Sequence, residues 1–143
     1  MSSAAEPVML AFYGRWHCSF PKGSGGLMAR RDWYCEDVLS GKLDVQRVYE
    51  DDRVLAFHHP RPAAEIHVVV VPKSHVPSLL DEAALDGDLL SSMVRAIQAT
   101  ATSLGLLDGK GFYVRANIAA PGVTPHMHWH VLGPGAGADW PGS

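Results

Sequence analysis

The hydrophobic and polar positions between residues 46 and 72 predict three β-strands. The segments 46–50 (QRVYE) and 53–59 (RVLAFHH) are rich in β-branched and aromatic residues, and two aspartates separate them. This arrangement predicts a β-hairpin. The segment 65–72 (EIHVVVVP) contains four consecutive valines, a run typical of a strand that is buried on both faces. Pro72 is expected to end this third strand.

Between residues 89 and 104 the apolar positions follow the period of a helix. Asp86 or Asp88 can cap the start of this helix, and Gly105 suits its end. One apolar stripe along the helix is formed by Leu89, Leu90, Met93, Val94, Ile97, Ala101 and Leu104.

The segments 111–117 (GFYVRAN) and 126–133 (HMHWHVLG) are predicted to be the fourth and fifth strands. Strands, then a helix, then strands, joined by short connections, indicate the α+β class. The expected architecture is a five-stranded antiparallel sheet, arranged as a meander, with the long helix on one face.

The fifth predicted strand carries a histidine at every second position. Side chains two residues apart on a strand point to the same face, so His126, His128 and His130 share one face. Met127 and Trp129 belong to the opposite face, where they can pack against the helix. A core position does not explain three imidazoles, because each buried ring needs hydrogen-bond partners. On the chemistry alone, the row can hold a catalytic zinc ion or provide a nucleophile with supporting imidazoles.

Size and charge limit the possible partners. The chain has 143 residues, of which 47% are hydrophobic and 19% are charged, and its formal net charge is −3. This length fits one domain, expected at 32–143, and residues 1–31 are expected to form an irregular extension. The mild acidity argues against nucleic acid or a membrane surface as a partner.

The beginning of the chain has no basic segment and only a short apolar run. Neither a signal peptide nor a membrane span is therefore predicted, and a cytoplasmic location is expected. Cys18 and Cys35 are the only cysteines. They can pair with each other, but without a secretory signal they are expected to stay reduced.

The segment 126–132 (HMHWHVL) resembles the signature of the histidine triad (HIT) family, in which three histidines alternate with apolar residues. Residues 48–76 are similar to the first half of the family domain, including a strand that ends in Pro-Lys-x-His at 72–75. The segment 131–142 (VLGPGAGADWPG) resembles the C-terminal tail of the Hint-like branch. The resemblance covers most of residues 32–143.

This resemblance implies a hydrolase or nucleotidyl transferase of the phosphoramidase type. The implied substrate is a small molecule, a purine nucleoside monophosphate derivative such as an AMP phosphoramidate. A P–N or P–O bond at its α-phosphate is cleaved through a nucleotidyl-histidine intermediate, and no metal or other cofactor is required. The alternative is a nucleotide-binding or scaffold protein with little turnover, and a metal-dependent hydrolase is a third reading.

The resemblance also implies a role for each site residue. His128 is the implied nucleophile, His130 the contact to the phosphate oxygens, and His126 the residue that holds the local geometry. His67 completes this catalytic group. The implied substrate-binding residues are Asn117 near the phosphate, Trp33, Tyr34 and Phe57 around the base, His59 at the sugar and Thr124 near the leaving group.

Two positions depart from the family pattern. Many members carry Cys-x-x-Cys and bind zinc with two histidines, but here an aspartate takes the place of the first cysteine. The candidates for a structural zinc site are Asp32, Cys35, His75 and His126. His59 stands where the family has a ribose-binding aspartate. A neutral imidazole offers one acceptor and one donor, so ribose is expected to bind more weakly or another sugar to replace it.

Members of the Hint-like branch form homodimers through the central helix and the fourth strand. The resemblance therefore implies that residues 111–117 form an edge at which a second copy of this chain binds.

Overall fold

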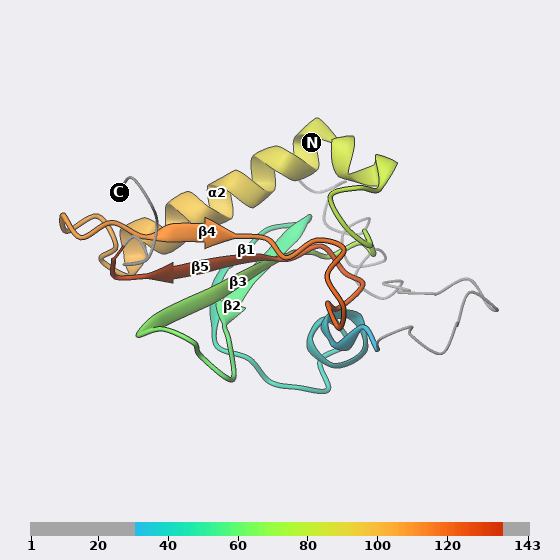
Figure 1. Cartoon of the computed structure of the whole chain (residues 1–143), viewed down its shortest axis with the longest axis horizontal. Coiled ribbons are helices and arrows are strands. Elements are labelled where there is room, and N and C mark those ends of the chain that lie inside the picture. The colour runs from blue at the N-terminus through green and yellow to red at the C-terminus, as the bar shows by residue number, and fades with distance from the viewer. Residues whose placement is uncertain (1–30, 136–143) are drawn as a thin grey trace, which may run out of the picture.

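The protein is described by a computed structural model that covers residues 31–135. In this range, a five-stranded antiparallel sheet carries one long helix on one face and a short helix against the other (Figure 1). The predicted α+β class is confirmed. Residues 1–30 and 136–143 lie outside the described residues, and so do most of the predicted extension and most of the segment 131–142. The predicted domain boundaries therefore stay a prediction.

The first three strands form where the sequence predicts them. They are β1 (Arg47–Glu50), β2 (Val54–His58) and β3 (Ile66–Pro72), and each pairs antiparallel with the next. In the turn between β1 and β2, the Asp51 carboxylate accepts hydrogen bonds from the backbone N–H groups of Arg53 (2.8 Å) and Val54 (2.9 Å). This side chain fixes the hairpin locally, which is why a short sequence pattern was enough to predict it.

The long helix, α2 (Gly87–Ser103), is capped as the sequence suggests. Of the two cap candidates, Asp86 is the one used, because its Oδ1 accepts from the N–H groups of Asp88 (3.0 Å) and Leu89 (3.3 Å). Gly105 follows the helix with φ +70°, a conformation that glycine adopts without steric cost.

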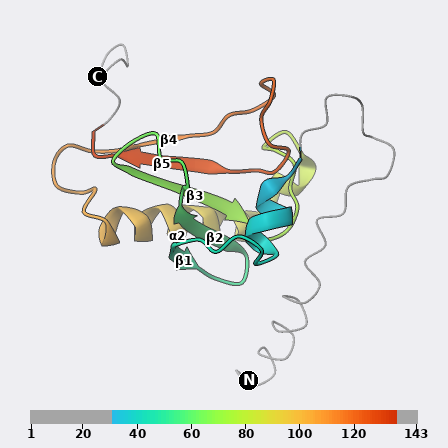
Figure 2. The same ribbon diagram turned by 90° about the horizontal axis from the view of Figure 1, so that it is seen from below.

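The last two strands are shorter than predicted and differently placed. They are β4 (Tyr113–Arg115) and β5 (Trp129–Gly133), and the strand order is β1-β2-β3-β5-β4. The predicted meander is therefore wrong beyond β3. The chain crosses through α2 to form β4 at the edge of the sheet, and β5 then fills the gap beside β3 (Figure 2). The histidine-bearing strand thereby gains a neighbour on each side.

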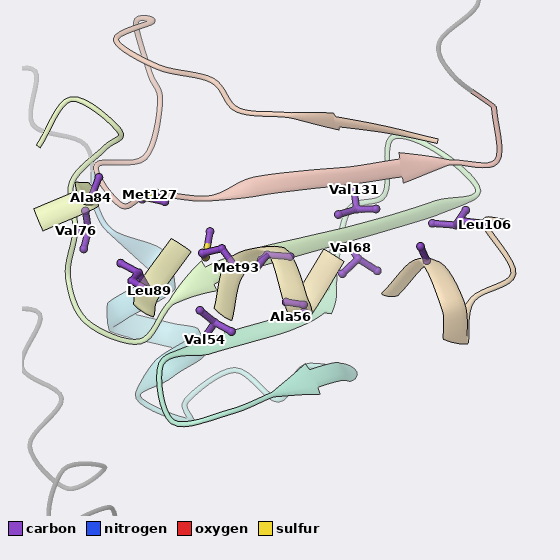
Figure 3. Close-up of a cluster of buried hydrophobic side chains, with 13 residues drawn as sticks. Val54, Ala56, Val68, Val76, Ala84, Leu89, Met93, Leu106, Met127 and Val131 are labelled. Carbon is purple, nitrogen blue, oxygen red and sulfur yellow. The ribbon is translucent and has the colours of Figure 1, made fainter. Parts of the chain in front are cut away.

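Two apolar layers hold the sheet. The layer beneath α2 contains alternate residues of the strands, such as Val68, Val70 and Val131, packed against Leu89 and Met93 of the helix (Figure 3).

The opposite layer contains the intervening residues, Val69 and Val71 among them, with Phe57 of β2. It is closed by Tyr34 and Val38 of a six-residue π-helix, η1 (Tyr34–Leu39). The short η1 has no apolar periodicity long enough to predict it from sequence. It lies beside the segment that leads into β5 (Figure 1).

A short 3₁₀-helix, η2 (Glu82–Leu85), precedes α2 and was also not predicted. Within residues 31–135, no helix is long and apolar enough to cross a membrane.

Candidate functional site

The three alternating histidines do face one side of the sheet, although two of them precede the strand. β5 begins at Trp129, so only His130 takes part in the ladder. Tyr34 of η1 packs against the rings of His126 and His128, with centroids 5.8 and 5.0 Å away. The predicted common face is thus confirmed, and the predicted strand is too long at its start.

The intervening residues face the helix, as the alternation predicts. Met127 and Val131 belong to the layer beneath α2, and Trp129 packs against it. The ladder does not extend back to residue 127 because the N–H of Met127 donates to the carbonyl of Val76, 2.6 Å away, instead of to a strand.

A hydrogen bond to the backbone fixes the tautomer of His128. Its Nδ1 lies 2.6 Å from the carbonyl oxygen of His126, and a carbonyl oxygen only accepts. Nδ1 therefore carries the proton, and Nε2 keeps its lone pair. Burial lowers the pKa of His128 below its ordinary value, so the ring is neutral near pH 7. This is the protonation state that a nucleophilic imidazole needs.

His67 and His130 form a second, oppositely oriented pair. The N–H of Ala63 donates to Nδ1 of His67 (2.9 Å), so in neutral His67 the proton is on Nε2. That Nε2 lies 2.8 Å from Nδ1 of His130 and donates to it, which leaves the proton of His130 on its Nε2. Burial lowers the pKa of His67 to about 4 and that of His130 to about 3. Both rings are therefore neutral hydrogen-bond donors near pH 7.

His59 extends the row of imidazoles to β2. Its ring stacks on His67 with centroids 4.5 Å apart and an interplanar angle of 16°. The N–H of Arg61 donates to Nδ1 of His59 (2.9 Å), so the one acceptor of a neutral His59 is already used. Burial lowers its pKa as well. A neutral imidazole has one acceptor and one donor nitrogen. Because Arg61 occupies the acceptor, His59 offers a ligand only its Nε2–H donor.

Of the predicted aromatic contacts, only one is accessible. Trp33 is half-buried, and its ring lies edge-on to His59 with centroids 5.9 Å apart. Phe57 and Tyr34 are 0% and 2% exposed and form part of the apolar layer beneath Trp33. These two residues support Trp33 from below, and the place of all three residues around a base stays a prediction.

Asn117 and Thr124 line the same pocket as His128. The pocket has a volume of about 280 Å³, and apolar side chains such as Ile118 and Val123 complete its wall. The substrate contacts expected of Asn117 and Thr124 stay predictions.

The four predicted zinc candidates also come together. The ligand atoms of Asp32, Cys35, His75 and His126 all lie within 4.8 Å of one another. Sγ of Cys35 is 3.2 Å from Nδ1 of His126 and 3.7 Å from Nδ1 of His75. Ligand atoms on a tetrahedral zinc ion with bonds of about 2.0–2.3 Å lie roughly 3.5 Å apart. The donor set and its spacing fit this ion.

The contact between His126 and Asp32 needs a proton or a metal ion between the two side chains. Nε2 of His126 donates to the carbonyl of Pro72, 2.8 Å away. In a neutral ring, Nδ1 would then carry a lone pair, and it faces Oδ2 of Asp32 at 2.8 Å. Two lone pairs at this distance require a proton or a metal ion between them. Burial alone raises the pKa of Asp32, but the hydrogen bond to His126 and its charge outweigh burial and lower it.

Cys35 differs from the sequence-based expectation. It is disulfide-bonded in this structure, so the expectation that it stays reduced is wrong here. A zinc ion would take the thiolate, which requires reduction of Cys35 first.

One charged residue on the histidine-bearing face of the sheet was not predicted from the sequence. Arg115 of β4 is the cross-strand partner of His130 on β5, so the two side chains stand on the same face. The alternation of Tyr113, Arg115 and Asn117 was the available signal. It became informative only once β4 was known to lie next to β5.

A two-layer α+β domain with alternating histidines in the interior of its sheet defines a histidine-triad class of protein. A family model described as the HIT domain matches residues 40–136, more than half of the chain. The chain belongs to the HIT family. This confirms the resemblance at the level of the family, whereas the Hint-like branch stays a prediction.

Individual relatives agree with this assignment. An uncharacterized HIT-like protein of Synechococcus elongatus is 34% identical over 112 residues, which span 74% of this chain and 96% of that protein. A solved histidine triad protein from Clostridium difficile is 36% identical, with a TM-score of 0.63, and the match covers 81% of this chain and 99% of that one. A HIT family hydrolase from Clostridium thermocellum is 28% identical, with a TM-score of 0.60 and coverage of 73% and 90%.

Proposed function

We propose that this protein is a nucleotide hydrolase or nucleotidyl transferase that cleaves a P–N or P–O bond at the α-phosphate of a nucleoside monophosphate derivative. The observation that carries the proposal is the tautomer of His128, whose Nδ1–H is held by a carbonyl 2.6 Å away while Nε2 keeps its lone pair. Relatives that are named HIT family hydrolases support the hydrolase class.

In the first step, Nε2 of His128 attacks the α-phosphorus. The new N–P bond forms as the bond from phosphorus to the leaving nitrogen or oxygen breaks, and the leaving atom takes a proton. In the second step, a water oxygen attacks the same phosphorus. The histidine–phosphorus bond breaks, the water proton is lost, and the nucleoside monophosphate is released.

Neighbouring groups stabilise the charge on the transferring phosphoryl group. The Nε2–H of His130 is aimed by the His67 hydrogen bond at its other ring nitrogen, 2.8 Å away. A donor that is positioned before the reaction needs no reorganisation when charge develops on the phosphoryl oxygens. Asn117 adds an amide in the pocket that His128 also lines.

The base and sugar lie, in this proposal, against Trp33 and His59. Trp33 provides an accessible ring on which a purine can stack, and His59 donates its Nε2–H to a sugar oxygen. Because His59 cannot accept from the two ribose hydroxyls, the sugar contact is weaker than a carboxylate would make it.

A zinc ion at Asp32, Cys35, His75 and His126 has a structural role in this proposal. It would tie η1 to the segment that carries the triad, because the first two ligands precede or begin η1 and the others follow β3 and precede β5. The reaction at His128 requires no metal.

We also propose a homodimer that forms at β4. This strand is the outer strand of the sheet, and Val114 and Ile118 at this edge are 43% and 37% exposed. Unpaired backbone groups of an edge strand can pair with a second copy. Light scattering at micromolar concentration should give twice the mass of one chain. A single-chain mass over the whole concentration range would contradict this.

The activity is tested by AMP release from adenosine 5′-phosphoramidate, with EDTA present and absent. The wild-type protein should release AMP in both conditions. His128→Asn, which keeps a polar side chain but not the nucleophile, should lower kcat at least about 10³-fold. Acid quench followed by intact-mass measurement should detect the nucleotidyl adduct on the wild-type chain only.

Folding of the variant is checked by its thermal unfolding curve, and nucleotide binding by calorimetry with AMP. Binding of AMP by a folded wild-type protein that releases no product would support the alternative, a nucleotide-binding or scaffold protein. Turnover that EDTA abolishes would favour a metal-dependent hydrolase instead.

A further inference from the structure

Arg115 occupies a defined position next to the triad. It is the last residue of β4 and the direct partner of His130, which β5 holds between β3 and β4. The Cβ atoms of such antiparallel partners lie about 5 Å apart on the same face of the sheet. The Arg115 side chain therefore leaves the sheet on the same face as the His130 ring, whose Nε2–H points to the phosphoryl group in the proposed reaction.

The charge of Arg115 is available to a ligand. Its side chain is exposed, and none of the carboxylates in residues 31–135 makes an ion pair with it. Burial is the main cause of the low pKa values of His67 and His130, and the charge of Arg115 lowers both further. Its field therefore reaches the imidazole row. An unpaired guanidinium beside two neutral donors favours an oxyanion.

The direction from the nucleophile identifies which part of the substrate Arg115 can reach. His59 and His67 come from the β2 and β3 side of β5, and Trp33 lies beside His59. Arg115 comes from β4, on the opposite side of β5. Nucleotidyl transfer to His128 requires the leaving group to depart away from the attacking nitrogen. With the base and sugar placed on the β2 side in the proposed complex, the β4 side, from which Arg115 comes, is the side left open to the leaving group.

We propose that Arg115 binds an oxyanion on the leaving group and makes the protein selective for substrates whose leaving group carries a carboxylate or a phosphate. This inference rests on the proposed nucleotidyl transfer at His128. The guanidinium can bind either oxyanion through two parallel hydrogen bonds. Pairing of the outer edge of β4 with a second copy uses backbone N–H and C=O groups, so it leaves the side chain of Arg115 available to a ligand.

The experiment compares kcat/KM for matched leaving groups. The carboxylate arm uses an adenosine 5′-phosphoramidate formed with β-alanine, next to its methyl ester. The phosphate arm uses diadenosine triphosphate, whose leaving group is ADP. Unsubstituted adenosine 5′-phosphoramidate, which releases ammonia, reports the basic reaction.

Arg115→Gln should reduce kcat/KM for the free carboxylate about tenfold relative to the methyl ester. Turnover of the unsubstituted phosphoramidate is measured for each variant as the reference, and each ratio is divided by it. Arg115→Lys should retain part of the preference, since it keeps the charge but not the fork. The matched control is Arg95→Gln, because Arg95 is an exposed residue of α2 on the opposite face of the sheet. The difference should shrink in 0.5 M salt, because screening weakens an exposed charge.

The outcomes separate the inference from the proposed function. A loss confined to the carboxylate arm assigns an amino-acid type of leaving group, and a loss confined to the phosphate arm assigns a polyphosphate. Equal loss in both arms assigns a general oxyanion site. If Arg115→Gln leaves every ratio unchanged while the wild-type protein is active, the inference is overturned. If the wild-type protein cleaves none of the substrates, the proposed function fails first.

Discussion

Two groups of imidazoles lie next to each other in this protein and have opposite electrostatics. His128 and His130, with His67, are neutral rings joined by hydrogen bonds to carbonyls, amides and one another. His126, two residues before His128, faces the buried carboxylate of Asp32 at 2.8 Å, and this contact needs a proton or a metal ion between the two groups. The same residue type at alternate positions therefore forms a row of neutral rings in one place and faces a buried carboxylate in the other.

The partner of Nδ1 makes this difference. A carbonyl fixes a proton there and frees Nε2 in His128, and an imidazole donor does the reverse in His130. A carboxylate recruits a cation in His126. His126, His128 and His130 are at most 8% exposed, so contact with water does not make their surroundings alike. Ring chemistry is therefore set by a single contact in each case.

The largest effect is expected when the charged cluster is broken. Asp32→Asn removes the buried negative charge beside His126 and should lower the free energy of unfolding by about 3–5 kcal/mol. Denaturant unfolding under reducing conditions, with zinc present and with a chelator, measures it. Zinc should stabilise the wild-type protein and leave the variant unchanged.

Asp44→Asn is the control, because Asp44 is an exposed carboxylate of the same charge. If Asp32→Asn unfolds at the same denaturant concentration as the control, the buried ion pair does not stabilise the fold. In that case the cluster around His126 contributes no more to the free energy of unfolding than an exposed carboxylate does.

The next effect concerns pH. A lowered pKa keeps an imidazole neutral to lower pH, so the acid limb of kcat/KM should lie below pH 6.5. The ordered pair His67 and His130 should protonate only near pH 4 and pH 3. Unfolded histidines take up protons near pH 6.5, so the stability contributed by these neutral rings is present above that pH. It falls as the pH drops toward 4.

A pH profile of AMP release, with unfolding curves at each pH, measures both changes. An acid limb at pH 6.5 or above would show that the imidazole row is as solvated as a free histidine, contrary to the structure.

The smallest effect concerns the sugar. His59 presents only a donor, so the wild-type protein should cleave ribo- and 2′-deoxyribo-phosphoramidates at similar rates. His59→Asp introduces a carboxylate that accepts from ribose hydroxyls, and it should increase the preference for ribose about tenfold. His59→Asn, with a neutral amide, serves as control. A strong ribose preference of the wild-type protein would show that another group binds the hydroxyls.

Short local sequence patterns were enough to predict the first hairpin and the long helix. The hairpin of β1 and β2 depends on the turn at Asp51, and α2 depends on its apolar stripe and on Asp86, all within a few residues of the elements they define. The alternating faces predicted for residues 126–131 are also confirmed, even though regular strand pairing begins only at Trp129. Strand order failed because nothing local specifies that β5 inserts between β3 and β4.

The alternation in the sequence is enough to predict that three imidazoles face one side and apolar side chains the other, because a period of two is a property of the extended backbone. The resemblance to a family added the candidate roles. The partners of the rings, Asp32 for His126 and His67 for His130, and the placement of Arg115 opposite His130 on the neighbouring strand become visible in the folded chain alone. These partners are distant in sequence, and hydrogen bonds of this kind exist only where the folded chain brings donor and acceptor within reach.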